Sequence, residues 1–325
     1  MLNIGELLNV PGLDAAMERV EEALAASVAG EDPFLSEVAG HLIGAGGKRF
    51  RPALCVSAAA AGGAEASEAV VLGAVAVELV HLGSLYHDDV IDEASSRRGV
   101  VSVNARWGNL VAILAGDFLL AKASEIAAGL GTEVASLLAS TIARLCEGQL
   151  GELQTAFSLN RTEEAYLASI AGKTAALLAA ACRIGGLAGG LDRPLVDQLT
   201  RFGHSIGMVF QIRDDVLDVV GTEQQLGKPA GNDLVEGVYT LPVIRALADP
   251  AAGPELTELL GGRLDELQRD EARRLVRCSA GIEAALAAGR RYADEAAGAA
   301  ERVGSGPVPD AFSRLGHRLL DDLAG

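Results

Sequence analysis

Residues Glu78–Gly99, ELVHLGSLYHDDVIDEASSRRG, decide the fold and the chemistry expected of this chain. Three aspartates, Asp88, Asp89 and Asp92, stand within five residues at the end of an apolar helical run. At about 100° per residue, Asp88 and Asp92 share one helix face, and His81 lies on that face about 10 Å further back. Carboxylates four residues apart repel each other, and the C-terminal end of a helix disfavours acids. The cluster therefore suits a hard divalent cation such as Mg²⁺, although a solvated acidic helix end would show the same pattern.

The same D-D-x-x-D pattern returns 126 positions later (214 minus 88) as Asp214, Asp215 and Asp218, again at the end of an apolar helical run. Two such helices facing each other would place one set of carboxylates on each wall of a cage. The opposed carboxylates would repel each other strongly when the cage is empty. The filled state must therefore contain several cations, or a polyanion that the cations bridge. A diphosphate bound by Mg²⁺ from both sides meets this requirement.

Basic residues stand out in a chain whose formal net charge is −17. The stretch Gly46–Pro52, GGKRFRP, is a Gly-Gly turn followed by cations that include Lys48 and Arg51, and Arg97 and Arg98 follow the first acidic motif. Arginine suits bidentate contact with phosphate, and lysine acts as a compact charge. Two further lysines, each of which alone would be read as a solvated side chain, complete the set: Lys173 and Lys228.

Apolar residues at helical spacing recur along the whole chain. The expected helices are Leu13–Val28, one from Pro33 to about Gly44, Arg51–Ala61, Ser67–Glu93, Leu110–Ala128, Glu133–Gln154, Thr162–Gly186, Leu195–Val220, Asn232–Ala248 with a kink or start near Pro242, and outer helices within Glu255–Ala300. No segment shows convincing alternation with hairpin turns, and no linker or tandem repeat stands out. The sequence predicts an all-α fold with one domain over residues 1–325.

Composition narrows the range of functions. Half of the 325 residues are hydrophobic and only 4% are aromatic, so Ala, Leu and Val dominate the expected core. The acidic balance argues against nucleic acid as a partner, because nucleic-acid binding needs a basic face. It also argues against electrostatic docking on anionic lipid.

The compartment is predicted from cysteines and apolar runs. Four distant cysteines without C-x-x-C spacing predict free buried thiols in a reducing environment. The first residues lack the pattern of a secretory signal, and Arg183 interrupts the longest apolar run, Ala175–Leu191. We expect a soluble cytoplasmic protein without a transmembrane segment.

Taken together, these motifs resemble those of the all-trans polyprenyl diphosphate synthases, most closely the medium- and long-chain bacterial members. They occur in the family's order between residues 46 and 242. The matching stretches are GGKRFRP, HLGSLYHDDVIDEASSRRG, GDF at Gly116–Phe118, GKT at Gly172–Thr174, FQIRDDVLD and GKPAGNDLVEGVYTLP. The resemblance implies the isoprenoid synthase fold, in which helices surround a central active-site cavity.

The resemblance also implies a reaction, the condensation of isopentenyl diphosphate with an allylic diphosphate, and Mg²⁺ as cofactor, with three ions when substrate is bound. Catalysis is expected from Asp88, Asp92, Asp214 and Lys173. The main metal ligands are expected to be Asp88, Asp92 and Asp214, with Asp89, Asp215 and Asp218 ligating or binding metal-bound waters. The homoallylic diphosphate is expected on Lys48, Arg51, His81 and Arg98. The allylic diphosphate is expected near Arg97, Lys173, Thr174, Gln211 and Lys228.

Product length is only partly readable. Short-chain relatives place a bulky aromatic residue four or five positions before the first aspartate, where this chain has Ser84 and Gly83. The first motif also lacks the two-residue insertion typical of bacterial farnesyl-type enzymes. Both features favour a product of roughly C30 or longer, since each helix turn below these positions adds about 5.4 Å. A geranylgeranyl or farnesyl product stays open, because Gly83 can simply permit helix packing and Leu119 or Leu120 can close the path.

Three other functions stay open at this point: a class I terpene cyclase, a non-catalytic subunit of a two-component synthase, and an acidic helical protein that only binds cations. A cyclase would carry a different second metal motif, and a non-catalytic subunit can lose the acidic pairs that this chain retains. Family resemblance further implies a homodimer, with transient membrane contact for product release. One departure is Val238, which replaces a lysine common in relatives.

Overall fold

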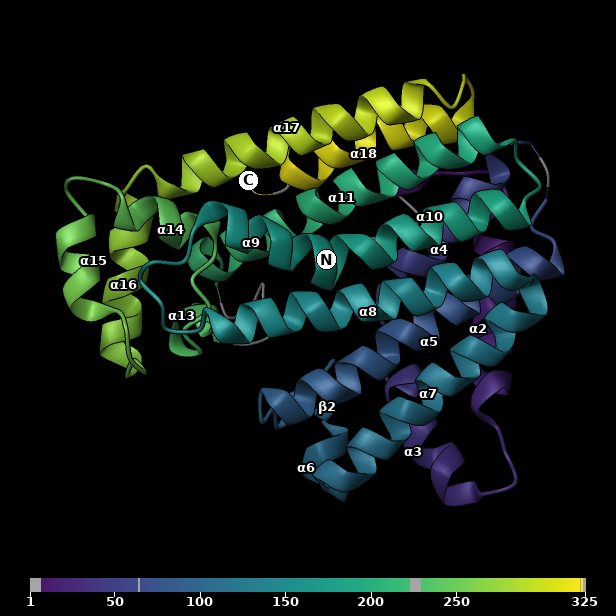
Figure 1. The fold of residues 1–325 in the computed structure, drawn as a ribbon, viewed down its shortest axis with the longest axis horizontal. Helices are drawn as coiled ribbons and strands as arrows, with labels where there is room; N and C mark the ends of the chain where they lie inside the picture. The colour runs from purple at the N-terminus through teal and green to yellow at the C-terminus, as the bar shows by residue number, and fades with distance from the viewer. Residues whose placement is uncertain (1–6, 64, 223–228, 322, 324–325) are drawn as a thin grey trace.

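Helices form nearly the whole of the computed structural model, which describes residues 7–63, 65–222, 229–321 and 323 (Figure 1). The elements are α2 (Leu13–Val28), α3 (Pro33–Gly44), α4 (Phe50–Ala60), α5 (Glu68–Ile91), β1 (Ser96–Arg97), β2 (Val100–Val101), α6 (Val103–Trp107), α7 (Asn109–Leu130), α8 (Thr132–Gln154), α9 (Glu163–Ile170), the π-helix η1 (Ala171–Ala175), α10 (Ala176–Ala188), α11 (Arg193–Val220), α13 (Asn232–Val235), α14 (Leu241–Leu247), α15 (Gly253–Leu259), α16 (Glu266–Cys278), α17 (Gly281–Glu301) and α18 (Pro307–Asp321). The predicted all-α fold is confirmed.

Helix α5 lies at the centre of the core. The Ser67 side chain caps its first turn by accepting a hydrogen bond from the backbone N–H of Val70, at 3.4 Å. The helix is apolar on nearly all sides, which is typical of a helix buried on all sides. It packs most extensively on α7 and also contacts α10, α4 and α2. The first acidic motif is therefore fixed at the end of a well-packed core helix.

The second acidic motif ends α11, which packs against α10, α17 and α18. Phe202 of α11 stacks on Phe312 of α18 with ring centroids 4.1 Å apart. The C-terminal helices thus pack one face on the core, and α17 lies at the outer edge of the molecule, as predicted for this tail (Figure 1). The packing of α17 on the core was not predicted, because α17 buries mainly alanines, whose small side chains give a weak apolar signal.

Two local features differ from the predicted elements, and a third agrees. The expected helix Thr162–Gly186 is interrupted by η1, whereas the start of α14 at Leu241 confirms the break predicted near Pro242. Strands β1 and β2 form a short antiparallel hairpin where no strand was expected. Its two turn residues, Arg98 and Gly99, have φ of 53° and 78°, and two-residue hairpins require such positive values. Cys146 and Cys278 are exposed, contrary to the expectation of buried thiols.

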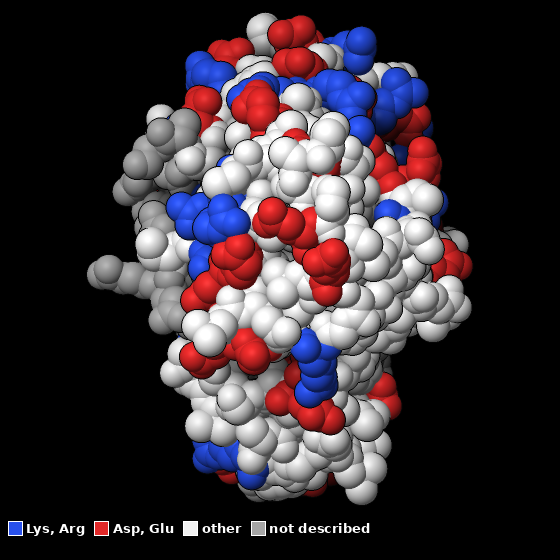
Figure 2. Space-filling model, turned by 90° about the vertical axis from the view of Figure 1, so that its left-hand side faces the viewer, with Lys and Arg blue, Asp and Glu red and all other residues white. Residues whose placement is uncertain are grey.

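Two helical segments are long and apolar enough to cross a membrane, within the part of the chain that the structure describes. They are Glu68–Ile91 and Glu163–Ala188, and 72% and 61% of their apolar windows are buried inside the protein. Core helices of a soluble protein pass the same test. On the face that looks left in Figure 1, acidic and basic side chains are interspersed (Figure 2).

Gly83 lies where α5 and α7 approach closely, which is the packing role that the sequence left open for this position. A Cβ atom there would lie 3.0 Å from the Gly116 carbonyl oxygen and 3.1 Å from Leu120 Cγ.

We predict that Gly83→Phe lowers the free energy of unfolding by about 1–3 kcal/mol or more, because the core cannot accept the added volume. The measurement is urea unfolding followed by circular dichroism.

Gly129→Ala on α7 is the matched control, since nothing lies within 4 Å of a Cβ at that position. It should leave stability unchanged or raise it by up to about 1 kcal/mol, the difference in helix propensity between the two residues. A Gly83→Phe protein as stable as this control would contradict the packing argument.

Candidate active site

The first acidic motif presents carboxylates in two directions. Asp88 is half-buried and Asp92 is exposed, whereas Asp89 is fully buried. Burial raises the pKa of Asp88 to about 6, with Lys173 acting against this shift and Asp92 adding to it. The Asp89 carboxylate accepts hydrogen bonds from Arg97, with Nε at 2.7 Å and Nη2 at 2.6 Å from Oδ1. Asp89 therefore ties the β1–β2 hairpin to the end of α5.

The second motif repeats this division on α11. Asp214 is exposed, and Asp215 is only 3% exposed. Asp215 accepts hydrogen bonds from the Tyr166 hydroxyl at 2.6 Å and from Gln211 Nε2 at 2.8 Å. Burial raises the pKa of Asp215 to about 7, although both hydrogen bonds favour its ionised form. Asp218 is also buried and accepts from the backbone N–H of Asp233 at 3.2 Å.

The π-helix η1 connects the two motifs. Lys173 Nζ lies 2.7 Å from Glu152 Oε1, and its charge interacts with Asp88 and Asp92. Burial disfavours the charged lysine, but the surrounding carboxylates outweigh it and raise the pKa of Lys173. The next residue, Thr174, donates its hydroxyl proton to Gln211 Oε1 at 2.6 Å, and Gln211 in turn binds Asp215. Short π-helical turns are frequent at functional sites, and this one places a cation beside one acidic motif and a hydrogen-bond chain to the other.

The approach of η1 to α8 depends on two glycines. A Cβ at Gly148 would lie 2.5 Å from the backbone nitrogen of Lys173, and one at Gly172 would lie 2.6 Å from the Arg144 carbonyl oxygen. Larger residues would push η1 away from α8 and separate Lys173 from Glu152. The glycine of the GKT motif is thus explained by backbone contact.

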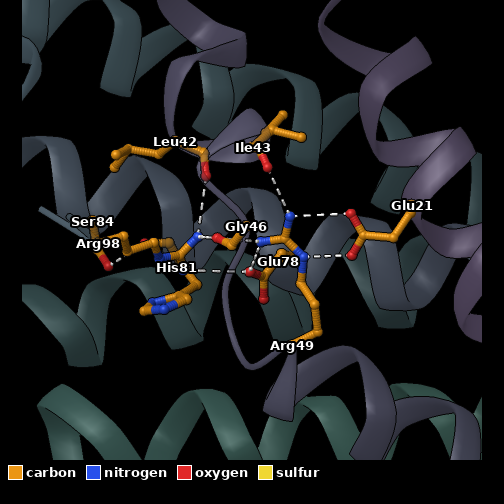
Figure 3. Close-up of polar contacts among 9 residues, drawn as sticks. All are labelled: Glu21, Leu42, Ile43, Gly46, Arg49, Glu78, His81, Ser84 and Arg98. Carbon is orange, nitrogen blue, oxygen red and sulfur yellow. Dashed lines mark hydrogen bonds and ion pairs between the residues drawn. The ribbon is translucent and has the colours of Figure 1, made fainter. Parts of the chain in front are cut away.

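The Gly-Gly loop brings a set of guanidinium groups to the flank of α5 (Figure 3). Arg49 has a left-handed backbone, with φ of 47°, and binds Glu21 and Glu78. Arg98 Nη1 donates to the carbonyl oxygens of Leu42, at 3.2 Å, and Gly46. Arg49 therefore shapes the loop, and Arg98 closes against it from the hairpin.

Arg51 and His81 lie in the same region. Burial lowers the pKa of Arg51 to about 10, with the positive charge of Arg98 contributing and Glu78 and Asp88 opposing. Arg51 thus lies within electrostatic reach of both the cationic cluster and the first acidic motif. Burial and the neighbouring arginines lower the pKa of His81 well below its usual value, so the imidazole is neutral at pH 7.

The predicted site residues thus fall into two groups around the motifs. One connected set contains the two acidic motifs together with Arg97, Lys173, Thr174 and Gln211. A second set beside it contains Arg51, His81 and Arg98. Lys48 is exposed at the loop. Lys228 lies outside the described residues.

The donor set fits a hard cation. Asp88, Asp92 and Asp214 supply carboxylate oxygens, which are the ligands that Mg²⁺ prefers. Among the described residues, no three acidic, histidine or cysteine side chains are already close enough to bind one ion. Asp89 and Asp215 each direct a hydrogen-bonded oxygen at protein groups, and their expected role toward the metal stays a prediction. The carboxylates of the two motifs therefore stand apart, and an anion with its cations would connect them.

Three residues were missed by sequence reasoning: Glu78, Glu152 and Tyr166. Glu78 carried a usable signal, because an acid in an apolar helix needs a cation partner. Glu152 and Tyr166 carried none, since each acts through a residue distant in the sequence.

Comparisons with known proteins agree with this geometry. The polyprenyl synthetase family profile matches residues 32–277. The nonaprenyl diphosphate synthase of Mycobacterium tuberculosis is 40% identical over 299 residues, covering 91% of this chain and 89% of that protein. Component 2 of heptaprenyl diphosphate synthase from Geobacillus stearothermophilus is 42% identical over 286 residues, covering 85% and 86% respectively. The crystal structure of polyprenyl synthase from Caulobacter crescentus CB15, complexed with calcium and isoprenyl diphosphate, superposes with a TM-score of 0.89 at 34% identity, covering 94% of each chain.

An all-α fold with two aspartate-rich helix ends beside a cationic loop defines an isoprenoid synthase. The chain belongs to the polyprenyl synthetase family and is a prenyltransferase, as the matches to nonaprenyl and heptaprenyl diphosphate synthases show. The resemblance to medium- and long-chain bacterial members is confirmed.

Removing the outward carboxylates tests the site. We predict that Asp88→Ala or Asp214→Ala lowers turnover at least about 100-fold, because charge developing on the leaving diphosphate loses its stabilisation. The fold should survive, since both side chains are partly or fully accessible. The measurement is release of pyrophosphate in the presence of Mg²⁺.

Asp14→Ala, an exposed aspartate on α2, is the control and should keep wild-type turnover. Turnover near the control's in either site variant would show that the acidic motifs are not the catalytic centre.

Proposed function

We propose that this chain condenses isopentenyl diphosphate with an allylic diphosphate and makes an all-trans polyprenyl diphosphate of medium or long chain. The observation that supports this most strongly is the connection of the two acidic motifs through Lys173, Thr174 and Gln211. It brings carboxylates and a cation together where a diphosphate could leave from an allylic carbon. The long-chain names of the relatives support the product class.

Asp88, Asp92 and Asp214 would bind Mg²⁺, which supplies positive charge for the departing diphosphate when bound. Arg97 and Lys173 would bind the allylic diphosphate oxygens and favour its leaving. Asp89 fixes Arg97 in that position. Asp215, anchored by Tyr166, would orient Gln211 and the end of α11. No step needs a protein base, because the released diphosphate can accept the proton.

The homoallylic diphosphate would bind on Lys48, Arg51, His81 and Arg98. A neutral His81 can donate one hydrogen bond without adding charge. The apolar wall of α5 below this point would exclude water from the allylic cation. We further propose that the whole chain acts as one unit in the cytoplasm, with membrane contact only when the long product leaves.

The direct test is incubation with labelled isopentenyl diphosphate and geranyl, farnesyl or geranylgeranyl diphosphate, with Mg²⁺ or with EDTA, followed by chromatography. We expect consumption of isopentenyl diphosphate only with Mg²⁺, and products of roughly C30 or longer.

Ser84→Phe should shorten these products, because Ser84 is half-buried on the Asp88 face one turn below it. A cyclic product, or no consumption of isopentenyl diphosphate, would refute the proposal, and an unchanged length with Ser84→Phe would place the tail elsewhere.

We also propose a homodimer formed through α7 and α8. Leu110, Leu114, Leu150 and Leu153 on these helices are 71%, 58%, 55% and 50% exposed. The two helices follow each other in the chain and contact each other, and they diverge from the turn that joins them (Figure 1). Exposed apolar surface of this kind marks an interface.

Leu110→Glu/Leu114→Glu should therefore halve the mass seen by light scattering, from twice the 33.4 kDa of one chain to a single chain. Leu267→Glu on α16, where the leucine is 83% exposed, is the control and should stay dimeric. A wild-type protein of single-chain mass would refute the dimer.

A further inference from the structure

One buried carboxylate, Glu78, lies among the arginines beside α5, and the reaction outlined above gives it no part (Figure 3). Glu78 is 1% exposed and stands one turn before His81 on the same helix. Its Oε1 lies 3.1 Å from Arg49 Nη1 and 3.8 Å from Arg98 Nη2. A buried carboxylate is tolerated only when cations and hydrogen bonds compensate its lost hydration, so these contacts define its role.

Arg98 is held on three sides. Its Nη1 donates to the carbonyl oxygens of Leu42 and Gly46, its Nη2 faces Glu78, and its guanidinium plane covers Gly47. A Cβ at Gly47 would lie 2.8 Å from Arg98 Cζ, so only glycine permits this contact. Of these groups, Glu78 is the single one that carries a negative charge. The arginine is thus placed before any diphosphate arrives.

Cations crowd around this carboxylate. Arg49, Arg51 and Arg98 each interact electrostatically with Glu78, and Arg98 also interacts unfavourably with Arg49 and Arg51. Without an anion between them, like charges at this spacing would move apart. With Glu78 present, they can stay close and still leave an excess of positive charge for a diphosphate.

We propose that Glu78 is a positioning residue for the homoallylic substrate. It fixes Arg98 in the geometry that receives the diphosphate of isopentenyl diphosphate. The inference rests on the proposed function, because it takes Arg98 as a ligand of that diphosphate. It predicts that replacing Glu78 raises the KM for isopentenyl diphosphate and leaves the KM for the allylic diphosphate unchanged. The reason is that the proposed allylic site is built from Lys173, Arg97 and the acidic motifs.

Glu21 provides a matched control for the structural role alone. Its oxygens lie 2.5 Å from Arg49 Nε and 3.1 Å from Arg49 Nη2, so it also fixes the loop arginine. Glu21 stands on α2 on the far side of Arg49 from Glu78, and its side chain binds Arg49 (Figure 3). A variant at Glu21 therefore disturbs Arg49 and leaves the Glu78–Arg98 contact intact.

The experiment compares steady-state kinetics of wild type, Glu78→Gln, Glu21→Gln and Arg98→Gln, with each substrate varied in turn. We expect Glu78→Gln to raise the KM for isopentenyl diphosphate at least about 10-fold, because Arg98 loses the carboxylate charge 3.8 Å from its Nη2, with the KM for the allylic diphosphate within about 2-fold. Glu21→Gln should keep both KM values within about 2-fold. An unchanged KM for isopentenyl diphosphate in Glu78→Gln, or equal changes for both substrates, would overturn the inference.

Arg98→Gln separates this inference from the proposed function. If Arg98→Gln leaves the KM for isopentenyl diphosphate unchanged, the assignment of the substrate site fails and the inference fails with it. If Arg98→Gln raises that KM and Glu78→Gln does not, the inference alone fails. Should Glu78→Gln not fold, the double variant Glu78→Gln/Arg49→Gln removes one buried charge of each sign. The raised KM should persist in it because Arg98 still lacks its carboxylate, and a wild-type KM would overturn the inference.

Discussion

Charge repulsion within the protein is the constraint on which the active-site structure depends. Two acidic motifs end α5 and α11, and an arginine cluster flanks α5. Each group is unfavourable in isolation, because like charges lie within a few ångströms of one another. The structure turns Asp89 of the first motif and Asp215 and Asp218 of the second inward as acceptors. Asp89 accepts from Arg97, Asp215 from Tyr166 and Gln211, and Asp218 from the Asp233 backbone. In the function proposed above, Asp88, Asp92 and Asp214 would meet the cations that arrive with substrate.

The same principle applies to the two substrate sites proposed above. On the proposed allylic side, Lys173 is balanced by Glu152 and by the first acidic motif. On the proposed homoallylic side, Arg49 and Arg98 are balanced by Glu78. Arg51 interacts with both Glu78 and Asp88, so it lies electrostatically between the two. A diphosphate on one side would therefore change the field felt on the other, which is useful in a reaction that must join two anionic substrates.

The fold class and the acidic motifs were predictable because helical periodicity and charge spacing are local properties of the sequence. The long α5 was predicted to within a residue or two at each end, since Ser67 caps it and the motif ends it. The division of labour within each motif was not predictable, because which aspartate faces Arg97 or Tyr166 depends on the hairpin and on α9. The π-helix was missed for a similar reason: glycines on α8 and η1 that meet only in the folded chain determine its position.

Positions 83 and 84 of α5 face different parts of the structure, and this difference bears on how product length is interpreted. Gly83 and Ser84 are adjacent in sequence, yet about 100° of rotation turns position 83 toward α7 and position 84 toward the Asp88 face. At position 83 a side chain would meet the Gly116 carbonyl and Leu120, so the glycine serves packing. At position 84 the serine is half-buried and donates its hydroxyl proton to the His81 carbonyl at 2.8 Å. A small residue at 84 therefore leaves space beside the motif, and a small residue at 83 brings two helices together. Residue size at these positions can be interpreted only once the facing direction is known, and the packing of α5 on α7 supplies that direction.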